Sequence, residues 1–183
     1  MRLYEETQEL NLHILVDTSA SMARPFPEKR RQALRFAVAL AYLALSGQQR
    51  VSLYTMGDTV KQDLPPLRGQ GNIEKIIQAA SRLNFEGFTD LEKSFQDFRP
   101  SRQRFGVIFV ISDFFGRDVN TAAEAVTRAA TWPGEVHFLQ IVHPSERSPE
   151  LEGEVELAEV ETGEKRRFWL TKRDVQRYVE TFD

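Results

Sequence analysis

The chain has 183 residues, of which 41% are hydrophobic and 28% charged, so it can form one globular domain with a substantial core. Its formal net charge of −3 argues against the clustered excess of cations that a nucleic-acid surface needs, and we expect no nucleic-acid partner. The absence of cysteine excludes disulfides, thiolate metal sites and cysteine nucleophiles, and fits a reducing compartment.

Membrane insertion is not expected for this segment. The first residues lack the apolar core of a signal peptide, and the longest apolar run, Phe36 to Leu45, is about half the length of a membrane-spanning helix. We predict a cytoplasmic domain over residues 1–183 that makes no membrane contact.

The first half of the chain begins with an apolar strand, Leu12 to Val16, followed by a long helix near Glu28 to Ser46. This helix is apolar on most sides from Phe36 onward, so we expect it to be largely buried. The basic residues near its start are expected to form a solvated face; they are Lys29, Arg30, Arg31 and Arg35.

A second strand is predicted from Arg50 to Met56, and Thr59 to Leu64 is expected to pair with it antiparallel through the turn at Gly57-Asp58. Asn72 can cap a helix whose apolar residues continue to Leu83. Thr89-Asp90-Leu91-Glu92 has the form of a capping box for a further short helix.

The second half repeats this alternation around a central strand, Phe105 to Ile111, which has no polar positions. A helix from about Thr121 to Trp132, a strand from Val136 to Val142, a hairpin around Thr162-Gly163 and a last helix capped by Thr171 follow. The pattern predicts one α/β domain with three layers: a mostly parallel central sheet with one antiparallel edge strand, and helices on both faces.

Five oxygen-bearing side chains are the candidate functional residues: Asp17, Ser19, Ser21, Thr89 and Asp113. Asp17 and Asp113 each follow an apolar strand, and ligands in open α/β sheets gather at the carboxyl ends of strands. Two carboxylates about 5 Å apart repel each other by roughly 3 kcal/mol at an effective dielectric of about 20, and a divalent cation removes this penalty. Hydroxyls and carboxylates without histidine or cysteine favour Mg²⁺ or Mn²⁺.

Four of these five residues also have a simpler explanation. Asp17, Ser19 and Asp113 can be turn residues after strands, and Thr89 can be a helix cap without any metal. Three short neutral ligands, however, leave an exchangeable position on the ion that an Asp or Glu of a partner protein could occupy. We therefore expect metal-dependent protein binding.

The segment Asp17-Thr18-Ser19-Ala20-Ser21, with Thr89 and Asp113, resembles the metal-ion-dependent adhesion site of von Willebrand factor A domains. All five positions match in type and order. The resemblance implies the Rossmann-like von Willebrand factor A fold. It also implies that Ser19, Ser21 and Thr89 touch the ion directly, while Asp17 and Asp113 act mainly through water.

The whole chain is more similar to a bacterial family called domain of unknown function fifty-eight. The similar stretches are Tyr4-Glu5-Glu6, Leu15 to Met22, Leu40 to Leu45 and Ile111-Ser112-Asp113-Phe114. Members of that family usually carry a further, often membrane-anchored, region before this stretch. The resemblance therefore implies a fragment or a shortened member, and membrane association for the complete protein. It also implies a MoxR-type AAA+ ATPase as a partner in chaperone or assembly work.

The best enzymatic alternative is a Mg²⁺-dependent phosphotransferase or phosphatase with Asp17 as its nucleophile. That chemistry usually needs a second acid two residues on, where this chain has Ser19. No serine-hydrolase elbow or nucleotide-binding P-loop is found, and we expect no enzymatic activity. About half of the phenylalanines near the five oxygens are expected to be buried, and at least one is expected at the rim of the partner site; they are Phe26, Phe88, Phe114 and Phe115.

Overall fold

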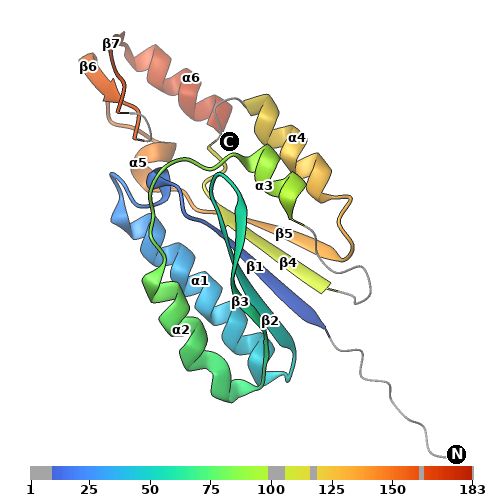
Figure 1. Cartoon of the computed structure of the whole chain (residues 1–183). Helices are drawn as coiled ribbons and strands as arrows, with labels where there is room; N and C mark the ends of the chain where they lie inside the picture. Colours follow the sequence, from blue (N-terminus) through green and yellow to red (C-terminus); the bar gives the residue numbers. More distant parts are fainter. Residues whose placement is uncertain (1–9, 99–105, 116–118, 161–162, 183) are drawn as a thin grey trace, which may run out of the picture.

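The computed structural model describes residues 10–98, 106–115, 119–160 and 163–182 (Figure 1). Its main sheet has five strands in the order β3-β2-β1-β4-β5. The strands are β1 (Asn11–Asp17), β2 (Arg50–Met56), β3 (Val60–Arg68), β4 (Gly106–Ser112) and β5 (Glu135–Gln140). All neighbouring pairs are parallel except β2 and β3, so the predicted mostly parallel sheet with one antiparallel edge strand is confirmed.

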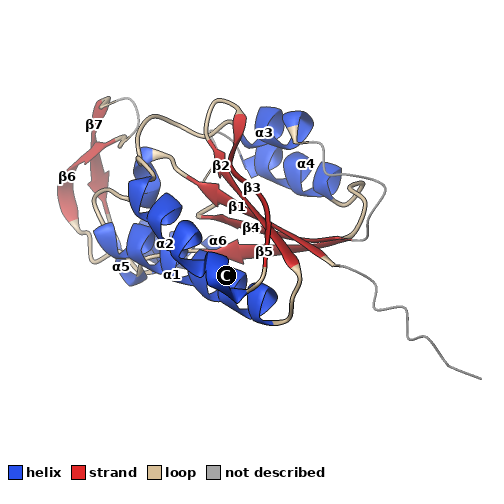
Figure 2. Cartoon of the chain, turned by 60° about the horizontal axis from the view of Figure 1, so that its bottom comes forward, coloured by secondary structure: helices blue, strands red, loops and turns tan. Residues whose placement is uncertain are grey.

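Helices cover both faces of this sheet (Figure 2). Helices α1 (Pro27–Ser46) and α2 (Ile73–Arg82) lie on one face, and α3 (Leu91–Asp97) and α4 (Val119–Ala129) lie on the other. The central strand β1 contributes to both layers, because Ile14 and Val16 pack in the cluster with α1, whereas Leu15 packs in the cluster with α3 and α4. Burial on both faces explains why this strand has no polar alternation.

Strand β3 is longer than predicted, because it continues through Pro65 and Pro66 to Arg68. It is the outer strand of the sheet, where a proline costs no hydrogen bond on the open side. Its pairing with β2 is irregular between Val51 and Tyr54, which accommodates the two prolines. The edge position therefore allows the strand to continue past its predicted end at Leu64.

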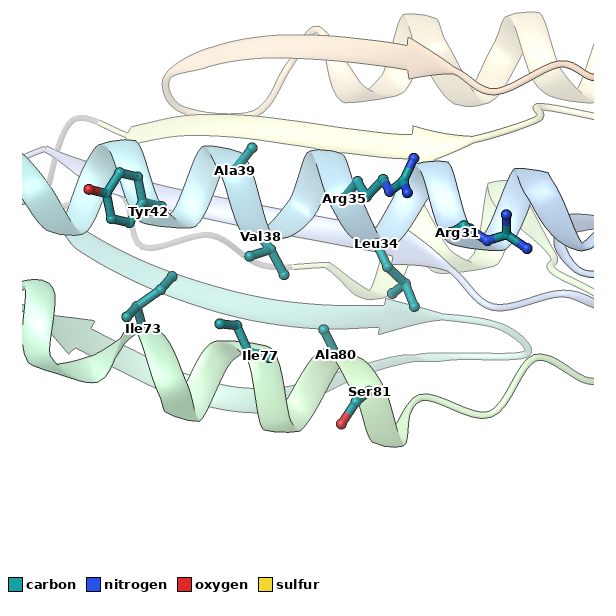
Figure 3. A pocket seen from close by; sticks show the side chains of 10 residues that line it. All are labelled: Arg31, Leu34, Arg35, Val38, Ala39, Tyr42, Ile73, Ile77, Ala80 and Ser81. Carbon is teal, nitrogen blue, oxygen red and sulfur yellow. The ribbon is translucent and has the colours of Figure 1, made fainter.

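Helix α1 is less buried than predicted. Its buried face is a narrow stripe, whereas Tyr42 and Leu43 are 45% and 67% exposed. Between α1 and α2 lies an open groove of about 770 Å³, into which Leu34 and Val38 of α1 and Ile77 of α2 project (Figure 3). Among the described residues, no helix combines the length and apolar character needed to cross a membrane.

A smaller unit follows β5 and contains α5 (Pro144–Arg147), the antiparallel pair β6 (Gly153–Ala158) and β7 (Lys165–Leu170), and α6 (Lys172–Phe182). The predicted hairpin of acidic and basic strands is confirmed, with Lys165 Nζ 2.8 Å from Glu156 Oε1, although Thr162 lies outside the described residues. Thr171 caps α6 as predicted, since its Oγ1 accepts the backbone N–H of Asp174 at 3.4 Å and its own backbone N–H donates to Asp174 Oδ2 at 2.9 Å. The stretch Tyr4-Glu5-Glu6 also lies outside the described residues.

His13 on β1 makes the stability of the domain depend on pH. It is 8% exposed, its Nδ1 lies 3.3 Å from the Tyr54 hydroxyl, and burial lowers the pKa of its imidazole below the ordinary value of 6.5. Between the folded pKa and 6.5 the unfolded chain binds more protons than the folded one, so the His13 contribution is complete above pH 6.5 and is lost as the pH falls.

We therefore expect the His13 contribution to the free energy of urea unfolding to decrease from pH 7.5 to pH 5, by at most about 1.4 kcal/mol per pH unit. His13→Phe removes the titrating group and should flatten this part of the profile. An identical slope in the wild type and the variant would contradict the assignment.

Candidate metal centre

The loop after β1 places Asp17, Ser19 and Ser21 at the carboxyl end of the sheet. Asp17 and Ser19 are 2% and 1% exposed. The Asp17 carboxylate folds the loop back on itself, because its Oδ1 accepts the backbone N–H of Ser19 at 2.8 Å. Ser19 and Ser21 flank the start of a 3₁₀ turn (Ala20–Met22), and their two Oγ atoms are 3.0 Å apart. Two hydroxyls therefore face each other beside a buried carboxylate.

Thr89 reaches the same place from a distant part of the sequence. Two backbone hydrogen bonds join its loop to the loop after β1: Glu86 N–H donates to the Thr18 carbonyl, and Ala20 N–H donates to the Gly87 carbonyl, both at 2.9 Å. The Thr89 hydroxyl then donates to Asp17 Oδ1 at 2.6 Å. The predicted capping role of Thr89 is wrong, since the N-cap of α3 is Asp90, which accepts the backbone N–H of Lys93 at 2.9 Å.

Asp113 follows β4, the strand beside β1, and is 1% exposed. The preceding Ser112 links the two strand ends, because its hydroxyl donates to Asp17 Oδ2. The chain turns sharply at Phe114, whose φ of 56° lies in the left-handed region that side chains rarely adopt. This turn lets the backbone N–H of Phe115 donate to Asp113 Oδ1 at 3.1 Å. Strained backbone beside a buried carboxylate is typical of functional sites.

The two carboxylates influence each other. Burial raises the pKa of Asp17 above its ordinary value, and the negative charge of Asp113 raises it further. Hydrogen bonds from Ser112, Thr89 and the Ser19 backbone N–H act in the opposite direction and favour the ionised form. A divalent cation at this edge would offset the repulsion between the two carboxylates.

Lys29 at the start of α1 is a site residue that sequence reasoning missed. Its side chain is 1% exposed, and its Nζ lies 2.9 Å from Asp113 Oδ2 and 2.7 Å from Glu146 Oε1 of α5. The prediction of a solvated position is therefore wrong for Lys29. A signal was present in the spacing, because Lys29 stands four residues before Ala33 and extends the buried stripe of α1, which continues with Ala37, Ala41 and Leu45.

The four phenylalanines near the site differ in exposure, and none is buried, so the expectation that about half of them are buried is wrong. Phe26 stacks on His143 with ring centroids 3.8 Å apart, and Phe114 packs edge-on against Phe138. Phe88 is half-buried. Phe115 is 42% exposed and its ring lies 5.3 Å from Lys29 Nζ, so it is the best candidate for an apolar rim beside Asp113.

The structure brings all five predicted site residues to one edge of the sheet. Asp17 accepts hydrogen bonds from Ser19 and Thr89 and from Ser112, the residue before Asp113, and Ser21 contacts Ser19. Within the described ranges, no three His, Cys, Asp or Glu side chains cluster closely enough to hold a metal ion. A cation at this edge would consequently be held by hydroxyl oxygens together with the two carboxylates. Such a set of hard, neutral and anionic oxygens fits Mg²⁺ or Mn²⁺ and does not fit a thiolate or imidazole site.

Comparison with solved structures gives the fold. A von Willebrand factor type A protein from Catenulispora acidiphila has a TM-score of 0.53 at 17% identity, over 72% of this chain and 33% of that one, so this chain spans about a third of it. BatB from Bacteroides thetaiotaomicron has a TM-score of 0.52 at 16% identity, over 94% of this chain and 86% of that chain. The manganese-loaded TRAP protein of Plasmodium vivax has a TM-score of 0.56 at 14% identity, over 73% and 57%.

These likenesses confirm the predicted von Willebrand factor A-like architecture. No curated protein sequence matches the chain. The family model described as "Protein of unknown function DUF58" matches residues 1–181, which is nearly the whole sequence. The chain belongs to the DUF58 family and has a von Willebrand factor A-like fold.

Proposed function

We propose that this domain binds a divalent cation, Mg²⁺ or Mn²⁺, and uses it to bind an acidic side chain of a partner protein. The observation that supports this most strongly is the meeting of three hydroxyl groups and two buried carboxylates, drawn from three separate loops, at one edge of the sheet. Turn formation and helix capping alone do not account for it, because Thr89 does not cap its helix but donates to Asp17 72 positions away in the sequence.

The hydrogen bonds suggest which side chains would contact the cation directly and which would act indirectly. Both oxygens of Asp17 already accept hydrogen bonds, and Asp113 accepts one on each oxygen. The hydroxyls of Ser19, Ser21 and Thr89 retain lone pairs that can meet a cation directly. In this proposal the three hydroxyls are ligands, while Asp17 and Asp113 orient them or bound water and supply the balancing charge. The similar TRAP structure is manganese-loaded, which supports a divalent ion in a domain of this fold.

Three neutral ligands leave positions for water and for one exchangeable group, and a partner carboxylate is the group best matched to a Mg²⁺-type ion. The exposed Phe115 beside Asp113 would add an apolar contact next to this charged one. A MoxR-type AAA+ ATPase, which the family resemblance implies, is the partner that we propose to test first.

Binding rather than phosphate chemistry is supported by the position of Asp17. A nucleophilic carboxylate needs an accessible oxygen with room for an in-line attack. Asp17 is 2% exposed, and its two oxygens accept three hydrogen bonds from Ser19, Thr89 and Ser112. We therefore propose a non-enzymatic role.

Affinity capture from cell extract tests the proposed function. In Mg²⁺ or Mn²⁺ the immobilised domain should retain a partner that EDTA releases, because the cation joins the two surfaces. Ser19→Ala combined with Ser21→Ala removes two proposed ligands and should abolish this retention. Ser81→Ala is the matched control, since it removes an exposed hydroxyl of α2 away from the site. A partner that stays bound in EDTA, or that binds the double variant equally, would contradict metal-mediated recognition.

A further inference from the structure

A buried ammonium group stands beside the candidate metal centre. Lys29 Nζ donates to Asp113 Oδ2 at 2.9 Å and to Glu146 Oε1 at 2.7 Å, and the three side chains are 1%, 1% and 16% exposed. Burying an ion pair is costly unless its hydrogen bonds are good, and both of these are short and charge-assisted. The single positive charge of Lys29 is thus shared by the carboxylates of Asp113 and Glu146, and Asp113 belongs to the proposed metal site.

Glu146 is itself held firmly. It lies in the first turn of α5, where its Oε2 accepts the backbone N–H of His143 at 2.8 Å. Its carbonyl oxygen accepts the Tyr178 hydroxyl of α6 at 2.7 Å. The pair with Lys29 therefore joins α1 to the smaller unit that follows β5, and Glu146 cannot easily leave the ammonium group.

We propose that Lys29 is the resident counter-ion of this site, and that it competes electrostatically with the divalent cation and so sets its affinity. This inference depends on the proposed metal binding. Without metal, Lys29 balances the charge of Asp113. A divalent cation that binds there is attracted less strongly, because Lys29 offsets the charge of Asp113, and it is also repelled by the ammonium group. Glu146 has the opposite effect, because it offsets the ammonium charge and leaves more of the negative potential of Asp113 available to the cation.

Three variants give a pattern that a merely structural role cannot produce. Lys29→Gln makes the cluster one charge more negative, and we expect about tenfold tighter Mn²⁺ and Mg²⁺ binding. Glu146→Gln makes it one charge more positive, and we expect about tenfold weaker binding. The double variant leaves the net charge unchanged and should bind within about threefold of the wild type. Isothermal titration with the metal salts alone measures all three affinities.

Arg31→Gln is the matched control, because it removes an exposed cation from the same helix and should leave the affinity unchanged. Circular dichroism identifies any variant that does not fold, and Glu146→Gln, at the more exposed end of the network, tests the proposal even if Lys29→Gln unfolds. Equal affinities in the wild type, Lys29→Gln and Glu146→Gln would overturn the role of Lys29 alone. A wild type that binds neither metal would overturn the proposed function itself.

Discussion

Millimolar Mg²⁺ or Mn²⁺ is expected to raise the melting temperature of this domain, and Asp17→Ala is expected to remove that rise. A ligand that binds only the folded state at ten to a hundred times its dissociation constant adds roughly 1.4 to 2.7 kcal/mol of stability. For a domain of this size that corresponds to a rise of about 3 to 10 °C. Asp17 is central to the effect because it positions Ser19 and Thr89 through hydrogen bonds of 2.8 and 2.6 Å and carries negative charge itself.

Differential scanning fluorimetry with and without EDTA measures this response. Asp63→Ala removes an exposed carboxylate of β3 and is the matched control, which should respond to metal as the wild type does. Asp17→Ala also removes the acceptor of three hydrogen bonds, so its metal-free melting curve must be recorded as its own reference. A wild-type curve that does not respond to either metal would count against a divalent-cation site, and an Asp17→Ala variant that still responds would mean that the ligands were misassigned.

The place where the candidate site residues meet could be predicted, because it depends on the most regular part of the fold. Apolar runs mark β1 and β4 as central strands, and parallel neighbours end at the same edge of the sheet. Asp17 directly follows Val16, and Asp113 comes two residues after Ile111, so both are expected at the carboxyl ends of these strands. Ser19 and Ser21 follow Asp17 within four residues and cannot lie far away.

The positions of Thr89 and Lys29 could not be predicted from local sequence patterns, because tertiary contacts determine them. The Thr-x-x-Glu pattern at Thr89 satisfies a capping rule, yet backbone hydrogen bonds to Thr18 and Ala20 carry its loop over the site, and these contacts are tertiary. Lys29 falls in a run of basic residues that suggests a solvated face. Only the four-residue spacing to Ala33 indicates burial, and its partners Asp113 and Glu146 are 84 and 117 positions away.

The exposure of α1 was predicted wrongly for a related reason. Apolar residues on most sides of a helix indicate how much surface could be buried, but they do not say which elements are available to cover it. The sheet covers the stripe that contains Ala37 and Ala41, and α2 covers part of a second side. The surface around Tyr42 and Leu43 stays exposed among the described residues.

Gly134→Ala is expected to destabilise the domain by about 3 kcal/mol or more, through both backbone strain and a steric clash. Gly134 immediately precedes β5 and has a φ of 116°, a conformation that residues with a side chain rarely adopt. A Cβ atom at this position would lie 2.2 Å from the carbonyl oxygen of Gly106, the first residue of β4. Relief would require β5 to move away from β4, with which it pairs from Glu135 onward. Urea unfolding monitored by circular dichroism measures the loss.

Gly71→Ala is the control for the same chemical change without these constraints. Its φ is not in the left-handed region, and a Cβ atom there would meet no atom within 4 Å. Because alanine restricts the unfolded chain more than glycine does, this variant should be neutral or more stable by up to about 1 kcal/mol. If Gly134→Ala cost no more than Gly71→Ala, the close approach of the first residues of β4 and β5 would not be essential. The pairing of β4 with β5, which places Gln140 Nε2 3.1 Å from the Asp113 carbonyl oxygen, would then not depend on this close approach.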